Sequence, residues 1–263
     1  YYTKGIIAAQ QAGYFVITLD RNPNSEGFKY SDRSFVCDIS DQNRVLAITK
    51  ELGVSGVIPL NDVGVPVASY VSSALKLPGI SRQSAIWATN KREMRKRWIE
   101  KGVPCPKVYI ASNKSEFYSG IEYVGYPCIL KPAHGFGGAS RGVIVVNSNR
   151  ELNYAIKFTQ GFYEDKTTLI ESFVDAELEH SAEVLIYQGE PHVIAISDKI
   201  KTPLPYRVDK NVLYPTIISG TRLSQLKKTI VDSVKALELK TGAAHVELAT
   251  TSEGFVLFEL GAR

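Results

Sequence analysis

The sequence has little of the features that would place it in a specialised class of protein. Its 263 residues hold 31 Lys and Arg against 27 Asp and Glu, a formal net charge of +4. That excess is too small to indicate binding to nucleic acid. We find no signal-peptide pattern and no apolar run long enough to cross a membrane. We therefore expect a cytoplasmic protein that binds neither nucleic acid nor membranes.

Cysteine is also scarce, and no glycine fingerprint of a dinucleotide site opens the chain. Cys37, Cys105 and Cys128 lack the spacing of a metal site, so we expect reduced thiols. Without the fingerprint, a nicotinamide-binding site loses its main support. The chain opens in a helical pattern and stops directly after an apolar strand pattern. We expect it to be a fragment of a longer protein.

The first third alternates short apolar runs with amphipathic helices. This pattern predicts a parallel, Rossmann-like sheet, in which ligands bind at the carboxyl ends of strands. Asp20, Asn61 and Asp62 follow such ends. The expected strands are 14–20, 35–38 and 56–60, and the expected helices are about 41–52 and 63–75.

The remainder is rich in strands behind a basic helical connector. The connector comprises Ser84 to Trp87 and then Lys91 to Lys101, and Gly102 and Pro104 end it. Two strands at the end are separated by Ser252-Glu253-Gly254, which predicts a hairpin. Further helices are expected at about 149–159 and 223–239. The fold class is thus α/β followed by α+β.

Four stretches stand out, and they occur in this order: TNKREMRKRWIEKGVPCP, YPCILKPAHGFGGASRGV, LIESFVDAELEHSAEVL and AAHVELATTSEGFVLFELGAR. Together they resemble the motifs of the ATP-grasp superfamily, in the branch related to carbamoyl-phosphate synthase and L-amino-acid ligases. The resemblance covers nearly the whole chain. It implies a Rossmann-like pre-ATP-grasp domain at 1–88, a small lobe with the glycine-rich loop at 89–168, and a large lobe at 169–263.

The resemblance implies a phosphate-binding side. Lys91 and Lys131 would contact the phosphates of ATP, with Lys131 also near the adenine. The glycine-rich loop from Gly135 to Gly142 would cover the β- and γ-phosphates, since backbone N–H groups bind such anions well. The loop is about two residues longer than the form common in this branch. For Lys91 the alternative is a solvated residue on a basic helix. The loop residues assigned to ATP are Gly137, Gly138, Ser140, Arg141 and Gly142.

The third stretch resembles the adenine and ribose segment. Glu171 would accept a hydrogen bond on the side of the exocyclic amine, Phe173 and Val174 would read adenine through their backbone, and Glu179 would bind the ribose hydroxyls. The alternative is an ordinary strand pair with glutamates that face solvent. Glu183 shares the face of Glu179 by alternation and could point into the cleft or to the surface.

Glu247 and Glu259 are the metal candidates, because each lies between apolar neighbours, where an unpaired carboxylate is costly. Two facing carboxylates suit Mg²⁺, with Mn²⁺ as the alternative metal. The family often has a third ligand, Asn, where this chain has Gly261. Arg263 matches the arginine that neutralises the transferring phosphoryl group.

Basic side chains are expected to face the substrate. The resemblance places Lys199, Lys201, Arg207 and Arg222 there, and Lys199 and Lys201 join Arg263 as catalytic candidates. The alternative is a solvated basic loop. A packed core residue is slightly favoured for His245 over a partner of Glu247. His134 and His180 receive no role.

The leading functional hypothesis is an ATP-dependent ligase. A small-molecule carboxylate would attack ATP to form an acyl-phosphate, and an amine would then displace phosphate. The enzyme would be a homodimer. The second reading is a carbamoyl-phosphate-synthase-like half that phosphorylates bicarbonate or carbamate. An ATP-binding module without turnover is the third, because Gly261 lacks a ligand atom. A nicotinamide-dependent dehydrogenase ranks last, because it leaves Lys131, the loop and both glutamates unexplained.

Overall fold

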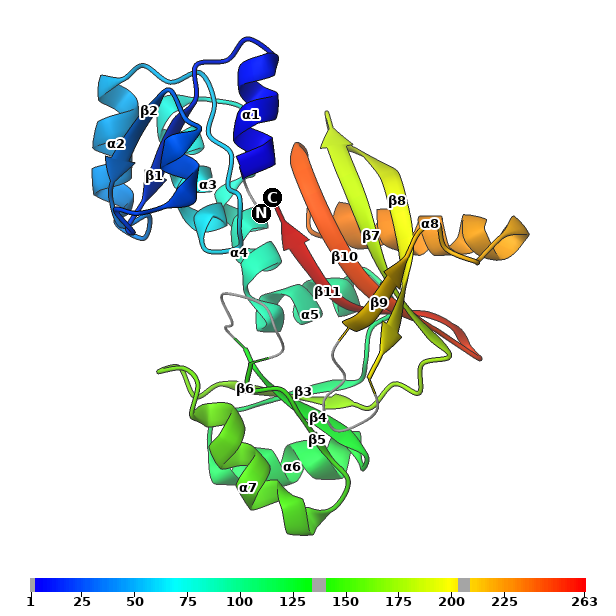
Figure 1. Ribbon diagram of the computed structural model, residues 1–263. Helices are drawn as coiled ribbons and strands as arrows, with labels where there is room; N and C mark the ends of the chain where they lie inside the picture. Colours follow the sequence, from blue (N-terminus) through cyan, green and yellow to red (C-terminus); the bar gives the residue numbers. More distant parts are fainter. Residues whose placement is uncertain (1–2, 134–140, 203–208) are drawn as a thin grey trace. The chain divides into compact units, whose positions relative to one another are not determined.

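The computed structural model describes residues 3–133, 141–202 and 209–263. The chain forms two compact units, Tyr1–Arg82 and Gln83–Arg263 (Figure 1). The boundary expected from the sequence follows residue 88. The observed boundary lies earlier because helix α4, Arg82–Thr89, packs on the second unit, where Ser84 Oγ donates to the carbonyl of Glu238.

The first unit holds two parallel strands and three α-helices among its described residues. Strands β1 and β2 pair in parallel, as expected. Its core includes Val45, Ile48, Val67 and Val71. The elements are α1 (Thr3–Gln11), β1 (Ile17–Asp20), the 3-10 helix η1 (Glu26–Lys29), β2 (Arg33–Val36), α2 (Gln42–Glu51) and α3 (Gly64–Leu75).

The strand predicted at 56–60 does not form. Pro59 has no N–H for a ladder, and Ile58 is 77% exposed, so this run lacks both a pairing partner and an apolar cover. Asp20 ends β1, as expected, but accepts hydrogen bonds from the Asn22 amide and the Ser25 hydroxyl. A larger Rossmann-like sheet in this unit therefore remains a prediction.

The second unit begins its β-structure with a four-stranded antiparallel sheet in the order β3-β6-β4-β5. Helices α6 (Lys114–Val124) and α7 (Asn149–Gln160) pack against it. Phe117, Leu130 and Ile170 belong to the core between them. Because side chains alternate along a strand, Lys131 and Glu171 lie on the opposite face. The strands are β3 (Val108–Ala111), β4 (Cys128–Pro132), β5 (Ile144–Val146) and β6 (Thr168–Ser172).

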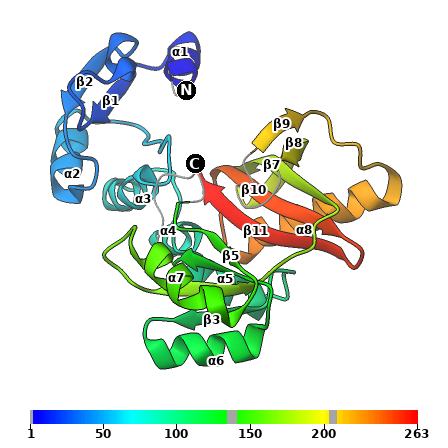
Figure 2. The same ribbon diagram turned by 60° about the horizontal axis from the view of Figure 1, so that its bottom comes forward.

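A second, five-stranded antiparallel sheet follows in the order β11-β10-β7-β8-β9 (Figure 2). Helix α8 (Gly220–Ala236) contacts β8 and β11 and buries Leu226, Ile230 and Val234. Helix α5 (Lys91–Glu100) contacts α8 through Trp98, whose indole donates to the Ser233 carbonyl. The strands are β7 (Leu178–Tyr187), β8 (Glu190–Lys201), β9 (Asp209–Leu213), β10 (Gly242–Thr251) and β11 (Gly254–Ala262).

The final hairpin is confirmed, with Thr251 opposite Gly254 across the turn. The sheets also locate the boundary within the second unit. All of β6 pairs with β3 and β4, so the expected cut between residues 168 and 169 falls inside a strand, and the four-stranded sheet ends at Ser172. No helix in the described part of the chain has the length and apolar character needed to cross a bilayer.

Helix α6 and strand β9 are among the elements that were not predicted from the sequence. Helix α6 has a readable start, since the Asn113 side chain accepts from the Glu116 amide and Glu116 accepts from the Ser112 amide. Strand β9 has no recognisable sequence pattern, because all five of its residues are exposed and show no apolar alternation.

Gly120 generates a test of the packing of α6. A Cβ at this position would lie 2.5 Å from Ile170 Cδ1 and 2.8 Å from Tyr109 Cδ1. Alanine favours a helix by about 1 kcal/mol over glycine, but overpacking costs about 1–3 kcal/mol. We therefore expect Gly120→Ala to lower the denaturation midpoint in urea. Gly5→Ala in α1, whose nearest contact would be 3.9 Å away, is the matched control and should not lower it. A midpoint for Gly120→Ala at or above wild type would contradict this account.

Candidate active site

Three charged side chains meet on one face of the four-stranded sheet, called the small sheet below. This is the face that α6 and α7 do not cover. Glu171 on β6 lies with its Oε2 2.7 Å from Lys131 Nζ on β4. Arg95 on α5 donates from Nε to Glu171 Oε1 at 2.8 Å. All three are buried. Arg95 and Lys131 thus engage both carboxylate oxygens of Glu171, and its expected role at the adenine amine stays a prediction.

Burial sets the protonation of this cluster. Desolvation, helped by the neighbouring Arg95, lowers the pKa of Lys131 to about 8. Burial by itself would raise the pKa of Glu171, but Arg95 and Lys131 outweigh it and hold that pKa below its ordinary value. Lys131 is thus a lysine whose charge responds to mild alkaline pH.

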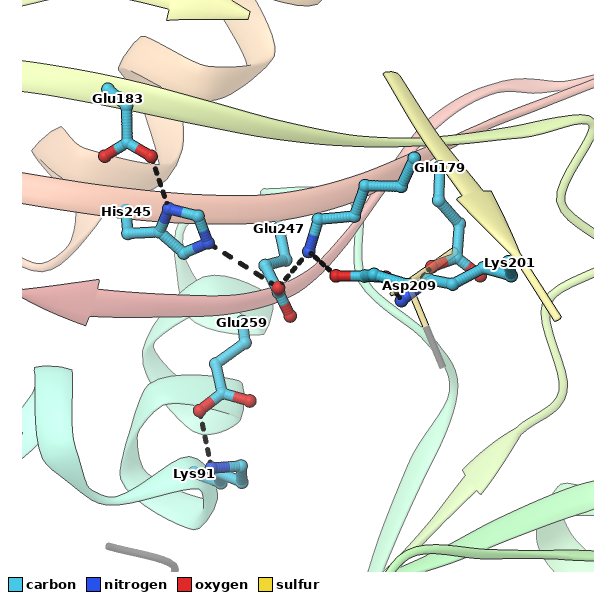
Figure 3. Close-up of polar contacts among 9 residues, drawn as sticks. Lys91, Glu179, Glu183, Lys201, Asp209, His245, Glu247 and Glu259 are labelled. Atoms are coloured by element: carbon cyan, nitrogen blue, oxygen red, sulfur yellow. Dashed lines mark hydrogen bonds and ion pairs between the residues drawn. The ribbon is translucent and has the colours of Figure 1, made fainter. Parts of the chain in front are cut away.

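The two metal candidates lie side by side on the five-stranded sheet, called the large sheet below. Glu247 on β10 and Glu259 on β11 are direct cross-strand partners, and such partners share a face of the sheet. This confirms the expected arrangement on adjacent antiparallel strands. Each carboxylate also meets a lysine: Glu259 lies 2.6 Å from Lys91 Nζ, and Glu247 pairs with Lys199 (Figure 3).

A histidine extends this row of charges. His245 Nδ1 lies 2.7 Å from Glu183 Oε1, and its Nε2 lies 3.6 Å from Glu247 Oε1 (Figure 3). The favoured reading of His245 as a packed core residue is wrong, because its partly exposed ring lies on the polar face beside Glu247. The hydrogen bond to Glu183 is the main reason that the pKa of His245 rises to about 9. His245 and Lys199 together hold the pKa of Glu247 well below its usual range, against the effect of burial.

Lys199 and Lys201 lie two residues apart on β8 and share an acidic partner. Asp209 on the edge strand β9 joins them, at 3.5 Å from Lys199 Nζ and in direct contact with Lys201. Glu179 on β7 lies 3.3 Å from Lys201. The polar face of the large sheet therefore holds Glu179 and Glu183 as well as both lysines, as alternation along β7 predicted.

Lys91 occupies the start of α5. Asn90 caps the helix by accepting from the Arg92 and Glu93 amides, and the Lys91 amide donates to Ala133, just after β4. The Lys91 side chain is largely buried against Glu259. The alternative of a solvated lysine on a basic helix does not hold.

Part of the expected phosphate loop lies outside the described residues, namely Gly137, Gly138 and Ser140, together with His134. Arg141 is exposed. Gly142 has φ +74, and a Cβ there would lie 2.9 Å from Pro132 Cγ. Only glycine satisfies both the backbone angle and this close contact.

The remaining expected residues that the structure describes lie between β6 and β7, after β11 and on α8. Phe173 and Val174 lie between β6 and β7, the last strand of one sheet and the first of the other. Arg263 follows β11 and exchanges backbone hydrogen bonds with Ala243. Arg222 does not join the lysines, because it lies on α8 and donates to Glu177 and the Thr251 carbonyl. Arg207 is outside the described residues.

His180 is a buried structural residue. Its Nδ1 lies 2.8 Å from Asp198 Oδ1 and its Nε2 lies 2.7 Å from Thr250 Oγ1. Burial lowers its pKa, so the ring is neutral at pH 7, with a proton on Nδ1 for Asp198 and Nε2 accepting from Thr250. This links β7 to β8 and β10 on the face opposite Glu247.

Two charged residues of the site, Arg95 and Asp209, were not predicted from the sequence. Arg95 sits in a helix with four other basic residues, and nothing local sets it apart. Asp209 lies on β9, which has no strand pattern. Only pairing between distant segments identifies either residue.

The carboxylate pair fits a hard divalent cation. No cluster of three or more His, Cys, Asp or Glu in the described ranges is arranged to hold a metal by itself. Two carboxylates that share a face, each already neutralised by a lysine, nevertheless supply the oxygen donors that Mg²⁺ takes when phosphate and water complete its shell.

Comparison with known proteins decides the family. A sequence model of the ATP-grasp domain matches residues 124–263, more than half of the chain. The chain belongs to the ATP-grasp family. A curated relative, the carbamoyl phosphate synthase large chain of Thermotoga sp. (strain RQ2), is 25% identical over 98% of this chain. The chain spans only 24% of that relative's length.

Solved structures show the same ATP-grasp fold. The ADP complex of N5-carboxyaminoimidazole ribonucleotide synthetase superposes with a TM-score of 0.86 at 20% identity, covering 99% of this chain and 67% of that one. The L-amino acid ligase of Bacillus licheniformis gives 0.83 at 22%, covering 98% and 63%. The biotin carboxylase domain dimer of Hydrogenobacter thermophilus 2-oxoglutarate carboxylase, solved with MgADP, ADP and bicarbonate, gives 0.80 at 16%, covering 99% and 61%.

The His245–Glu183 pair of this ATP-grasp chain generates a titration test. We expect the His245 imidazole to titrate near pH 9 by NMR, and closer to its ordinary value of about 6.5 in Glu183→Gln. Since the folded pKa is the higher one, the pair stabilises fully below pH 6.5 and loses its effect as pH rises through 9. The stability deficit of Glu183→Gln should therefore shrink by pH 10. Glu190→Gln, an exposed carboxylate on β8, is the control; an unshifted His245 in wild type would refute the pair.

Proposed function

We propose that this chain is the ATP-binding part of a ligase that joins a small-molecule carboxylate to an amine through an acyl-phosphate. The observation that supports this most directly is the cross-strand pair Glu247 and Glu259, neutralised by lysines from β8 and α5. That arrangement suits a metal-bound triphosphate, and it belongs to a chain with the ATP-grasp fold.

In the proposed mechanism, the lysines bind the nucleotide. Lys131 and Lys91 exchange part of their pairing with Glu171 and Glu259 for phosphate oxygens, which are acceptors of the same charge. The backbone of Phe173 and Val174 reads adenine, and Glu179 takes the ribose. The glycine-rich residues Gly137, Gly138, Ser140, Arg141 and Gly142 complete the phosphate contacts.

Glu247 and Glu259 would hold Mg²⁺, which would supply positive charge against the negative charge of the phosphates. Mn²⁺ as a substitute remains a prediction. Gly261 offers no side-chain donor, so water and phosphate would fill that position.

The reaction has two displacements. An oxygen of the carboxylate substrate attacks the γ-phosphorus, and the bond to the β,γ-bridging oxygen breaks to release ADP. The amine nitrogen then attacks the acyl carbon, phosphate leaves, and the nitrogen loses a proton. Arg263, Lys199 and Lys201 would position the carboxylate and balance charge on the phosphoryl group, so catalysis rests on placement and electrostatics.

A second candidate is a synthase half that phosphorylates bicarbonate or carbamate. The similarity to the carbamoyl phosphate synthase large chain along 98% of this chain favours it. Bicarbonate is itself a small carboxylate, so both candidates use the same first displacement. We also propose a cytoplasmic location and a homodimer, in line with the dimeric biotin carboxylase domain of similar fold.

Lys131 provides a binding test. Lys131→Met should weaken ATP binding by about 2 kcal/mol, or about thirtyfold, the scale of a charge-assisted contact. Because the pKa of Lys131 is about 8, wild-type affinity in isothermal titration should fall as pH rises through 8. Lys131→Met should lose that pH dependence. Lys96→Met, which removes an exposed charge of α5, is the control; equal ATP affinity in folded Lys131→Met would refute the assignment.

Glu259 provides a turnover test. The protein should release ADP from ATP when a panel of amino acids, small carboxylates and bicarbonate is supplied with Mg²⁺. Glu259→Gln should abolish this release and the gain in ATP affinity from Mg²⁺, because one of the two carboxylates is lost. ATP binding should persist without metal. Full ADP release by Glu259→Gln would exclude the ligase mechanism, whereas binding without turnover in wild type would identify a nucleotide-binding module.

A further inference from the structure

Arg95 is the buried charge that the proposed reaction leaves unused. It is 0% exposed, and its neighbours Glu171 and Lys131 are 3% and 8% exposed. A buried ion pair is weak support for stability by itself, because desolvating the charges offsets much of their attraction. Two cations sharing one buried carboxylate are costlier still. The cluster therefore calls for a reason other than stability.

The guanidinium contacts both sheets of the second unit. On one side, its Nε lies 2.8 Å from Glu171 Oε1 and its Nη2 lies 3.4 Å from Glu171 Oε2. Oε2 of the same carboxylate also pairs with Lys131 at 2.7 Å. Arg95 thus holds the Glu171 carboxylate in the position in which it pairs with Lys131.

On the other side, Nη2 donates to the carbonyl of Phe258 on β11. Phe258 is the extra residue of a β-bulge: Glu247 pairs with Glu259, but the next pair is Leu248 with Leu257. A bulge leaves its extra residue outside the ladder, and here Arg95 hydrogen-bonds that residue's carbonyl.

The bulge decides where Glu259 points. Side chains alternate with a period of two, so a shift of one residue moves them to the other face. If Phe258 entered the ladder opposite Glu247, Glu259 would pair with Val246 instead, and its carboxylate would lose its place opposite Glu247. The hydrogen bond from Arg95 stabilises the bulge at Phe258, the residue directly before Glu259.

We propose that Arg95 is a positioning residue that couples the nucleotide lysine Lys131, through Glu171, to the metal carboxylate Glu259, through the Phe258 carbonyl. The proposal rests on the ATP-binding function put forward above. Lysine is no substitute, because its single ammonium lacks the planar fork that reaches the carboxylate side-on and the carbonyl at once.

Isothermal titration of ATP, with and without Mg²⁺ and without carboxylate substrate, tests this. Arg95→Lys should weaken metal-free binding about tenfold and reduce the gain from Mg²⁺ about tenfold, because each arm is disturbed. Arg97→Lys is the control on the same helix, since Arg97 contacts the Ala236 carbonyl and Glu238 instead. It should change neither quantity.

The double variant separates positioning from general damage. In a Lys131→Met background, Arg95→Lys should no longer weaken metal-free binding but should still reduce the Mg²⁺ gain. A purely structural role predicts fewer binding-competent molecules with an unchanged Kd, or the same loss with and without Lys131. Either result overturns the proposal, as does a folded Arg95→Lys with both quantities within about twofold of wild type.

Two further outcomes are assigned. If Arg95→Lys does not fold, Glu171→Asp replaces it, since it keeps every charge and retracts the carboxylate by one methylene. Metal-free affinity should then fall, and unchanged affinity would overturn the proposal. If wild type binds no ATP, the proposed function fails, which is distinct from the failure of the coupling.

Discussion

The arrangement of the site depends on the neutralisation of carboxylates by cations, at the buried Glu171 and at the partly exposed Glu247 and Glu259. Glu171, Glu247 and Glu259 come from three different strands, and each meets a lysine or arginine from another segment. A buried carboxylate without such a partner would be strongly unfavourable. The pairing therefore favours the arrangement that brings these strands together with α5 and β8 around the candidate site.

The same pairing prepares the site for a charged ligand. Lysines that already balance carboxylates can exchange them for phosphate oxygens at modest cost, since both are anionic acceptors. Lys131 shows the limit of this device. Its burial and the nearby Arg95 lower its pKa to about 8. Lys131 is therefore still charged near neutral pH but loses its charge at mildly alkaline pH.

The two faces of the large sheet divide the work. One face packs apolar side chains against α8 and holds the neutral His180 between Asp198 and Thr250. The other presents Glu179, Glu247 and the β8 lysines. Alternation with a period of two produces this separation, and the bulge at Phe258 adjusts it at one position.

What the sequence by itself determined is the part that local pattern and motif order express: most strands and helices, the final hairpin, and the placement of Glu247 and Glu259 on adjacent strands. Those features follow from alternation, caps and turn residues within short windows. The strand at 56–60 failed because apolar composition does not guarantee a pairing partner, and β9 was missed because it has no pattern at all. Only the tertiary structure decided that Glu171 binds Lys131 and Arg95, that His245 pairs with Glu183, and that Arg222 lies away from the lysines. A charged side chain reaches across several ångströms to a partner set by the packing of distant segments, and no local pattern encodes that choice.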